Sequence, residues 1–87
     1  MKVLMKPIEL IAWFTKDGAP NPLKYKIQGE NGENITVNIE KIILRQEEKL
    51  AGNRMFIYRC QSTINCVERI FELKYELNTC KWFLYKM

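Results

Sequence analysis

Hydrophobic and polar side chains alternate along most of the chain, and this period of two predicts β-strands. The alternation is strictest where Leu23 and Tyr25 face away from Lys24 and Lys26. An earlier segment alternates in the same way and carries Trp13 on its less apolar face. We predict strands over five segments: residues 7–15, 23–28, 35–39, 54–60 and 80–85.

Two further segments, residues 39–51 and 64–77, fit either a strand or a helix. In the first, good helix formers precede Gly52, which suits a helix C-terminus, but the consecutive apolar residues 42–44 are typical of a strand that bends or bulges. In the second, three glutamates stand at helical spacing, but aromatic side chains alternate with charged ones and favour a strand. The pattern alone leaves both alternatives open.

Clusters of Gly, Pro and Asn separate these segments and predict turns. Asp17 and Gly18 precede two prolines, residues 29–32 contain two glycines, and Asn78 begins a tight turn before the last segment. Short strands joined by such turns predict an all-β fold of about six antiparallel strands, a meander that forms a small barrel or a strongly curved sheet. The length suits a single small domain over residues 1–87.

The composition excludes several classes of function. The chain has no histidine, which is the usual acid or base near neutral pH and the commonest metal ligand, so imidazole-based triads are excluded. Pro7 and Glu9 interrupt the apolar start of the chain, so we expect no signal peptide. No apolar run approaches the length of a membrane-spanning helix. We therefore expect no enzyme, no cofactor and no association with a membrane.

Three cysteines, Cys60, Cys66 and Cys80, cannot all pair with one another, so at least one thiol is free. A free thiol suits a reducing cytoplasm, where we expect the protein to be located. No two of the cysteines have the close spacing of a zinc site, and no histidine completes a ligand set. A disulfide between Cys60 and Cys66 would need their Cα atoms within about 7 Å, which the sequence does not determine.

Basic side chains form the first candidate for a binding surface. Fourteen Lys and Arg against ten Asp and Glu give a net charge of +4. Lysines beside tyrosines could attract phosphates and stack bases, although alternating lysines are also the ordinary solvated face of a sheet. The residues of this candidate ligand or nucleic-acid surface are Lys24, Lys26, Arg59, Lys74, Lys81 and Lys86.

Trp13 and Trp82 form the second candidate, because each either packs in a core layer or anchors a partner. The pattern favours packing for Trp13, on the less apolar face of the first strand. Apolar residues fall on both faces of the first and last predicted strands, however, and one face of a curled sheet cannot bury them all. We therefore expect self-association, as a twofold dimer, or coverage by another protein.

Strand and turn residues form four motifs that together span nearly the whole chain: Pro7-Ile8-Glu9, Asp17-Gly18-x-Pro20 followed by Pro22-Leu23-Lys24-Tyr25, Tyr75-Glu76-Leu77, and Lys81-Trp82-Phe83-Leu84. With these motifs the chain resembles a family of small, uncharacterised bacterial all-β proteins. The resemblance implies strands over residues 40–48 and 67–77. Some members are encoded near, or fused to, translesion DNA polymerases, which implies a connection to nucleic acid by association.

These observations predict a non-catalytic binding or protein-interaction module, with an unknown protein or a second copy of the chain as its partner. The alternative is a small barrel that binds single-stranded nucleic acid. Such binding would be weak and sensitive to salt, because the net charge is modest.

Overall fold

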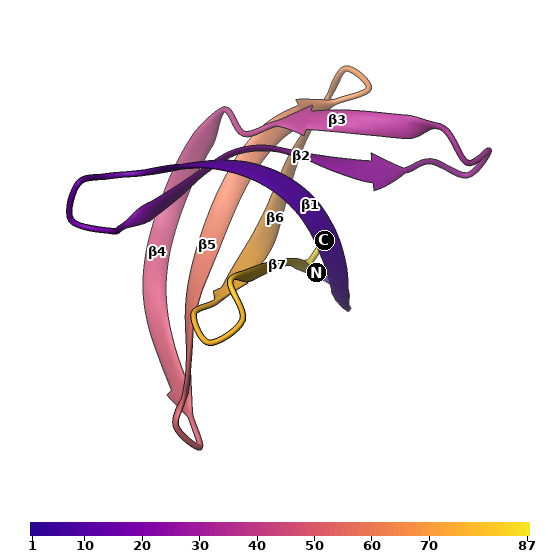
Figure 1. Cartoon of the computed structure of the whole chain (residues 1–87). Coiled ribbons are helices and arrows are strands. Elements are labelled where there is room, and N and C mark those ends of the chain that lie inside the picture. The colour runs from indigo at the N-terminus through magenta and orange to yellow at the C-terminus, as the bar shows by residue number, and fades with distance from the viewer.

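Seven β-strands and no helix make up the fold in a computed structural model that describes all 87 residues. The strands are β1 (Val3–Phe14), β2 (Pro20–Gln28), β3 (Asn34–Asn38), β4 (Lys41–Leu50), β5 (Asn53–Ile64), β6 (Val67–Glu76) and β7 (Lys81–Lys86). They form one antiparallel sheet with the order β3-β2-β1-β7-β6-β5-β4 (Figure 1). The fold therefore contains no helix that could cross a membrane.

The all-β prediction is confirmed, with seven strands where the sequence pattern indicated about six. The additional strand arises because the chain bends between β3 and β4. The consecutive apolar residues of β4 form a bulge, since the pairing register with β5 shifts between Ile42 and Leu44. The helical alternative for residues 39–51 and 64–77 is wrong, because these residues form β4, β6 and the ends of the connections beside them.

Two tight turns set the register of three neighbouring strands, β4, β5 and β6. Ala51 and Gly52 join β4 to β5 with φ angles of 51° and 82°, and Asn65 and Cys66 join β5 to β6 with φ angles of 51° and 63°. Positive φ at both central residues is typical of the type I′ turn, whose twist matches that of the strands on either side. Both hairpins therefore pair over nearly their whole length.

The sheet curls into a half-barrel because one short link ties its two ends together. The N–H of Ile39 donates to the carbonyl of Leu23 in β2 at 2.8 Å. The next N–H, that of Glu40, donates to the carbonyl of Gln61 in β5 at 3.0 Å. Because β3 and β4 form no ladder with each other, the barrel is open between them and β4 is left as an edge strand.

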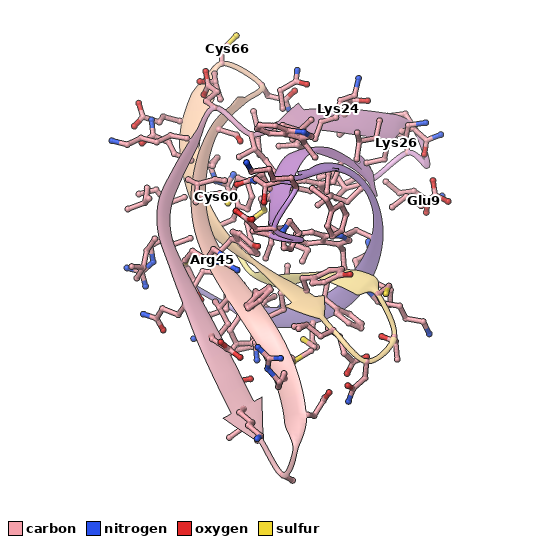
Figure 2. The ribbon with its side chains drawn as sticks, turned by 60° about the vertical axis from the view of Figure 1, so that its left-hand side comes forward. Glu9, Lys24, Lys26, Arg45, Cys60 and Cys66 are labelled. Atoms are coloured by element: carbon pink, nitrogen blue, oxygen red, sulfur yellow. The ribbon has the colours of Figure 1, made fainter.

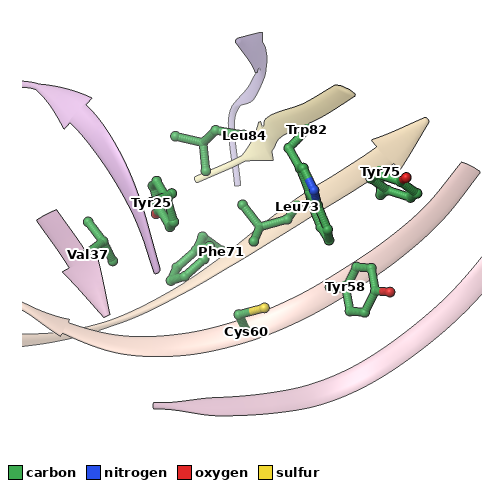
Figure 3. Close-up of a cluster of buried hydrophobic side chains, with 9 residues drawn as sticks. All are labelled: Tyr25, Val37, Tyr58, Cys60, Phe71, Leu73, Tyr75, Trp82 and Leu84. Carbon is green, nitrogen blue, oxygen red and sulfur yellow. The ribbon is translucent and has the colours of Figure 1, made fainter. Parts of the chain in front are cut away.

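The concave inner face of the half-barrel holds an aromatic core (Figure 3). Tyr25 packs edge-on against Phe71 with 5.5 Å between ring centroids, as its alternation with Lys24 and Lys26 predicted. The ring of Trp82 lies 4.7 Å from that of Tyr75, and its neighbours include Tyr58 on β5. Nine buried residues form the core: Tyr25, Val37, Tyr58, Cys60, Phe71, Leu73, Tyr75, Trp82 and Leu84.

Two buried tyrosines differ in what their hydroxyl groups contact. The Tyr58 hydroxyl donates to the carbonyl of Pro20 at 2.5 Å and accepts a hydrogen bond from Nε of Arg45 at 3.2 Å. The first bond ties β5 to the start of β2, two strands that are not neighbours in the sheet. The Tyr25 hydroxyl has no hydrogen-bond partner. Burial raises the pKa of both hydroxyls, so both remain protonated at neutral pH.

These contacts predict different effects on stability when each tyrosine loses its hydroxyl group by substitution with phenylalanine. Tyr58→Phe leaves the buried Pro20 carbonyl without its donor, so we expect the free energy of unfolding to fall by about 1–3 kcal/mol. Tyr25→Phe is the matched control, because it removes a buried hydroxyl without a partner and should not lower the free energy of unfolding. Urea unfolding followed by circular dichroism measures both. Equal losses in the two variants would contradict a stabilising role for the Tyr58 hydrogen bond.

Candidate binding surface

The six cationic residues of the predicted ligand surface lie in three separate places. Lys24 and Lys26 are exposed on β2, where the side-chain view shows them close together (Figure 2). A second group lies on the outer face of β5, β6 and β7, and Lys81 stands alone at the start of β7. The structure therefore does not bring the six together into one basic patch. The second group consists of Arg59, Lys74 and Lys86.

The cations of the second group form ion pairs with neighbouring carboxylates or cation–π contacts with a neighbouring ring. Arg59 forms an ion pair with Glu72 at 2.9 Å, and Lys74 forms one with Glu48 at 3.1 Å. The ammonium of Lys74 also lies 4.0 Å from the ring centroid of Tyr85, and its residue is only 7% exposed. Arg59 and Lys74 already have carboxylate partners, and the ammonium of Lys86 lies 4.9 Å from the ring centroid of Tyr85. This group therefore offers little free charge to a phosphate.

Lys81 stands opposite Glu76 in the ladder between β6 and β7. The Glu76 carboxylate accepts hydrogen bonds from the Thr79 hydroxyl at 2.5 Å and the Asn53 amide at 2.9 Å, and these bonds hold the pKa of Glu76 below its ordinary value. The carboxylate therefore stays ionised beside Lys81. Lys81 begins β7, directly after the turn that joins these strands, and lies apart from the other cations.

The two lysines of β2 differ from the second group, because neither has a carboxylate within ion-pair distance and neither lies over an aromatic ring. Lys26 lies between Glu9 on β1 and Thr36 on β3, and Lys24 lies opposite Ile11 on β1. An open groove of about 480 Å³ runs between these side chains. Two ammonium groups on the outer face of β2 are thus available to a ligand or partner.

Three exposed apolar side chains lie beside these lysines. On β1, Ile11 is 55% exposed and Trp13 is 62% exposed, while the alternate residues of this strand pack against the core. Leu23 on β2 is 47% exposed. We call Ile11, Trp13, Leu23, Lys24 and Lys26 the Trp13 surface.

The alternation placed Leu23 on the same face of the strand as Tyr25, but Leu23 is exposed while Tyr25 is buried. Pairing between β1 and β2 shifts register, so that Ile11 lies opposite Lys24 while Ala12 lies opposite Pro22. Leu23 is the additional residue of this bulge and does not continue the inward side of the alternation. Proline cannot donate to a ladder, and Pro22 therefore was the signal in the sequence that regular pairing would be interrupted here.

The two tryptophans have opposite environments. Trp82 is 7% exposed and packs against Tyr58 and Tyr75, so little of its ring is accessible to a partner. Packing was the wrong expectation for Trp13, because the sheet has a single layer and nothing covers its outer face at β1. Of the two candidate interface residues, Trp13 alone is accessible to a partner.

The three thiols lie in different environments, and no disulfide joins them. Cys60 is buried in β5, and burial raises the pKa of its thiol to about 12. Cys66 lies in the turn between β5 and β6, at the end of the molecule in Figure 2, and Cys80 lies in the turn before β7. No three His, Cys, Asp or Glu side chains are grouped so that they could hold a metal ion.

Comparison with protein-family models, with curated proteins and with solved structures finds no match for this chain.

The opposite environments of the two tryptophans predict different fluorescence for single-tryptophan variants. In Trp82→Phe the remaining Trp13 should emit at long wavelength and be quenched strongly by acrylamide, because its ring lies in water. In Trp13→Phe the remaining Trp82 should emit at shorter wavelength and resist quenching until the protein unfolds. Equal quenching of the two folded variants would contradict the exposure of Trp13.

Proposed function

We propose that this protein is a non-catalytic binding module that docks another protein on the Trp13 surface. The observation that carries the proposal is a tryptophan 62% exposed on a regular strand, with two further exposed apolar side chains and two unpaired lysines beside it. Tryptophan is enriched among the residues that dominate interface energies, because its large rigid ring buries much area at little entropic cost. Clustered exposed apolar groups with a polar rim are typical of interaction sites.

The rim of the Trp13 surface indicates the charge of the partner. Lys24 and Lys26 supply two positive groups, and the chain as a whole has a net charge of +4. Charges at the rim of an interface act mainly on the association rate and on the choice of partner. The partner we propose therefore presents an apolar pocket for Trp13 with acidic side chains beside it.

We propose no catalytic step for this chain. Cys60 is a protonated thiol at neutral pH, because burial raises its pKa to about 12, and it lies in the core rather than in a groove. The groove beside Lys24 is lined by strand residues, among them Glu9 and Thr36, rather than by the long loops on which active sites are usually built. All three cysteines are free, and we propose the cytoplasm as the compartment that keeps them reduced.

A second candidate function is weak binding of single-stranded nucleic acid. The observation in its favour is that an exposed indole lies on the same outer face as two lysines without carboxylate partners. A base could stack on Trp13 while phosphates contact Lys24 and Lys26. Two phosphate contacts would give a slope of about −1.4 in log K against log salt concentration, far below that of proteins with broad basic grooves.

Site-specific photo-crosslinking tests the proposed docking surface in cells. A photoreactive residue at position 11 lies in the Trp13 surface, and one at position 50 is the control, because Leu50 is 64% exposed at the opposite side of the sheet order. We expect a protein partner to be crosslinked from position 11 and not from position 50. Crosslinking of the same proteins from both positions would contradict a specific surface.

Affinity measured with the purified partner then tests the role of the indole. Trp13→Ala should weaken binding by about 2 kcal/mol or more, about 30-fold in Kd, whereas the matched control Leu50→Ala should leave Kd unchanged. Reversing both lysines in Lys24→Glu/Lys26→Glu should slow association most at low salt. Lys16→Glu/Lys49→Glu makes the same change of net charge at exposed positions elsewhere and is the control. Loss of binding in both double variants would indicate a general charge effect and contradict the site.

The nucleic-acid alternative has its own readout in the Trp82→Phe variant. Single-stranded oligonucleotides that stack on Trp13 should quench its fluorescence at low salt, and Lys24→Glu/Lys26→Glu should abolish the quenching. An unchanged spectrum at low salt would eliminate this alternative.

A further inference from the structure

The outermost strand β4 has an unpaired edge along its whole length. It pairs with β5 on one side, and the order of the sheet ends there. Every residue of β4 except Glu48 is exposed, and the cartoon shows β4 running along the margin of the half-barrel (Figure 1). A strand in this position presents a row of backbone N–H and C=O groups that can pair with another strand.

Natural sheets protect such edges with short strands, prolines, bulges or charges. The opposite edge, β3, is protected in this way, because it has five residues and begins and ends with asparagine. β4 has ten residues, no proline, and a bulge only near its start, at Ile43. Its five charged residues carry both signs, so they oppose many partner strands but not a strand of complementary charge. From Leu44 to Leu50 its pairing with β5 is regular, so this part of the edge is straight enough to accept a partner strand.

Two residues of this regular part, Arg45 and Glu47, become complementary when the strand pairs antiparallel with a second copy of itself. In a twofold antiparallel pair with Gln46 on the axis, Arg45 of one chain lies opposite Glu47 of the other, and this contact occurs twice. The neighbouring positions place Leu44 opposite Glu48. Centring the pair on Arg45 or on Glu47 instead places like charges directly opposite, which destabilises a sheet.

The surroundings of Arg45 in the single chain fit such a contact. Its Nε donates to the Tyr58 hydroxyl at 3.2 Å, and its guanidinium carbon lies 4.2 Å from the ring centroid of Phe56. No carboxylate lies within ion-pair distance of it. The guanidinium is thus held in place by two aromatic side chains, with its terminal N–H groups free to donate to a carboxylate.

Glu47 can accept this contact without losing its own partner. One of its oxygens, Oε1, pairs with Arg54 at 2.5 Å, and both side chains of that pair are nearly half exposed. The second oxygen remains available to the arginine of another chain, since a carboxylate accepts at both oxygens.

From these observations we infer that β4 pairs with β4 of a second copy of this chain, antiparallel and with Gln46 on the twofold axis, so that the two sheets join edge to edge. The pairing uses residues 44–48 of each copy. It goes beyond the proposed function, because the Trp13 surface lies on β1 and β2 and takes no part in the ladder.

Charge reversal tests the ladder by sedimentation velocity over a concentration series. Arg45→Glu places two glutamates opposite each other and Glu47→Arg places two arginines opposite each other, so each variant should dimerise at least about tenfold more weakly than the unaltered chain. An equimolar mixture of the two variants should form a heterodimer, because both contacts become complementary again. The double variant Arg45→Glu/Glu47→Arg should dimerise by itself for the same reason.

Lys49→Glu is the matched control, because it makes the same charge change as Arg45→Glu on the same strand but lies outside the paired segment. It should leave dimerisation unchanged. Circular dichroism of each variant checks the fold, and recovery of dimer in the mixture shows directly that both single variants are folded.

Disulfide trapping tests the register independently. In a chain carrying Cys66→Ser and Cys80→Ser, a cysteine at position 46 faces its own copy across the axis, where Cα atoms of paired residues lie about 4.5–5.5 Å apart. Gln46→Cys should therefore form a covalent dimer on mild oxidation. Leu44→Cys is the control, because the two copies of residue 44 lie four residues apart along the strands, about 13 Å, and should not crosslink.

Three results would overturn the inference. The unaltered chain could remain monomeric up to several hundred micromolar. The two charge-reversed variants could dimerise as well as the unaltered chain, or fail to recover when mixed. A dimer abolished by Trp13→Ala and unaffected by Arg45→Glu would place self-association on the Trp13 surface instead, which leaves the proposed docking role to be judged by its own crosslinking test.

Discussion

The curl of the sheet depends on two consecutive peptide groups. The N–H groups of Ile39 and Glu40 bond to β2 and to β5, each of which lies next to an end strand on opposite sides of the strand order. The chain has no helix and no second sheet to cover its apolar face, so only curvature can bury it. The Tyr58 hydroxyl bond to Pro20 crosses the same interior and strengthens the closure. The buried core and the free edge of β4 both follow from this incomplete closure.

A single curled layer buries one face and leaves the other to water. Over β5 to β7 the outer face is covered by its own side chains, because Arg59 pairs with Glu72 and Lys74 lies between Glu48 and the Tyr85 ring. Over β1 and β2 no such cover exists, and apolar side chains stand beside unpaired lysines. A lysine on β6, Lys74, is therefore held by neighbouring side chains of the sheet, whereas the lysines on β2 remain available for binding.

The local pattern of the sequence was sufficient to predict most strands and turns. It was not sufficient to predict where a strand bulges or bends. Period two placed Tyr25 on the face away from Lys24 and Lys26, and Tyr25 is buried. It could not place Leu23, because a bulge changes which face a residue occupies without changing the alternation. It also left residues 39–51 open between strand and helix and did not place the bend at Ile39 and Glu40, since that bend is held by hydrogen bonds to residues far along the chain.

The sequence by itself determined the fold class, the turns and most of the core, because alternation and turn chemistry act between residues close along the chain. Only the tertiary structure decided which lysines are free, since Lys24 and Lys74 look alike in the pattern and differ in the carboxylate and ring packed against them. It also decided that Trp13 is exposed and Trp82 buried, because the facing strands determine what covers each ring.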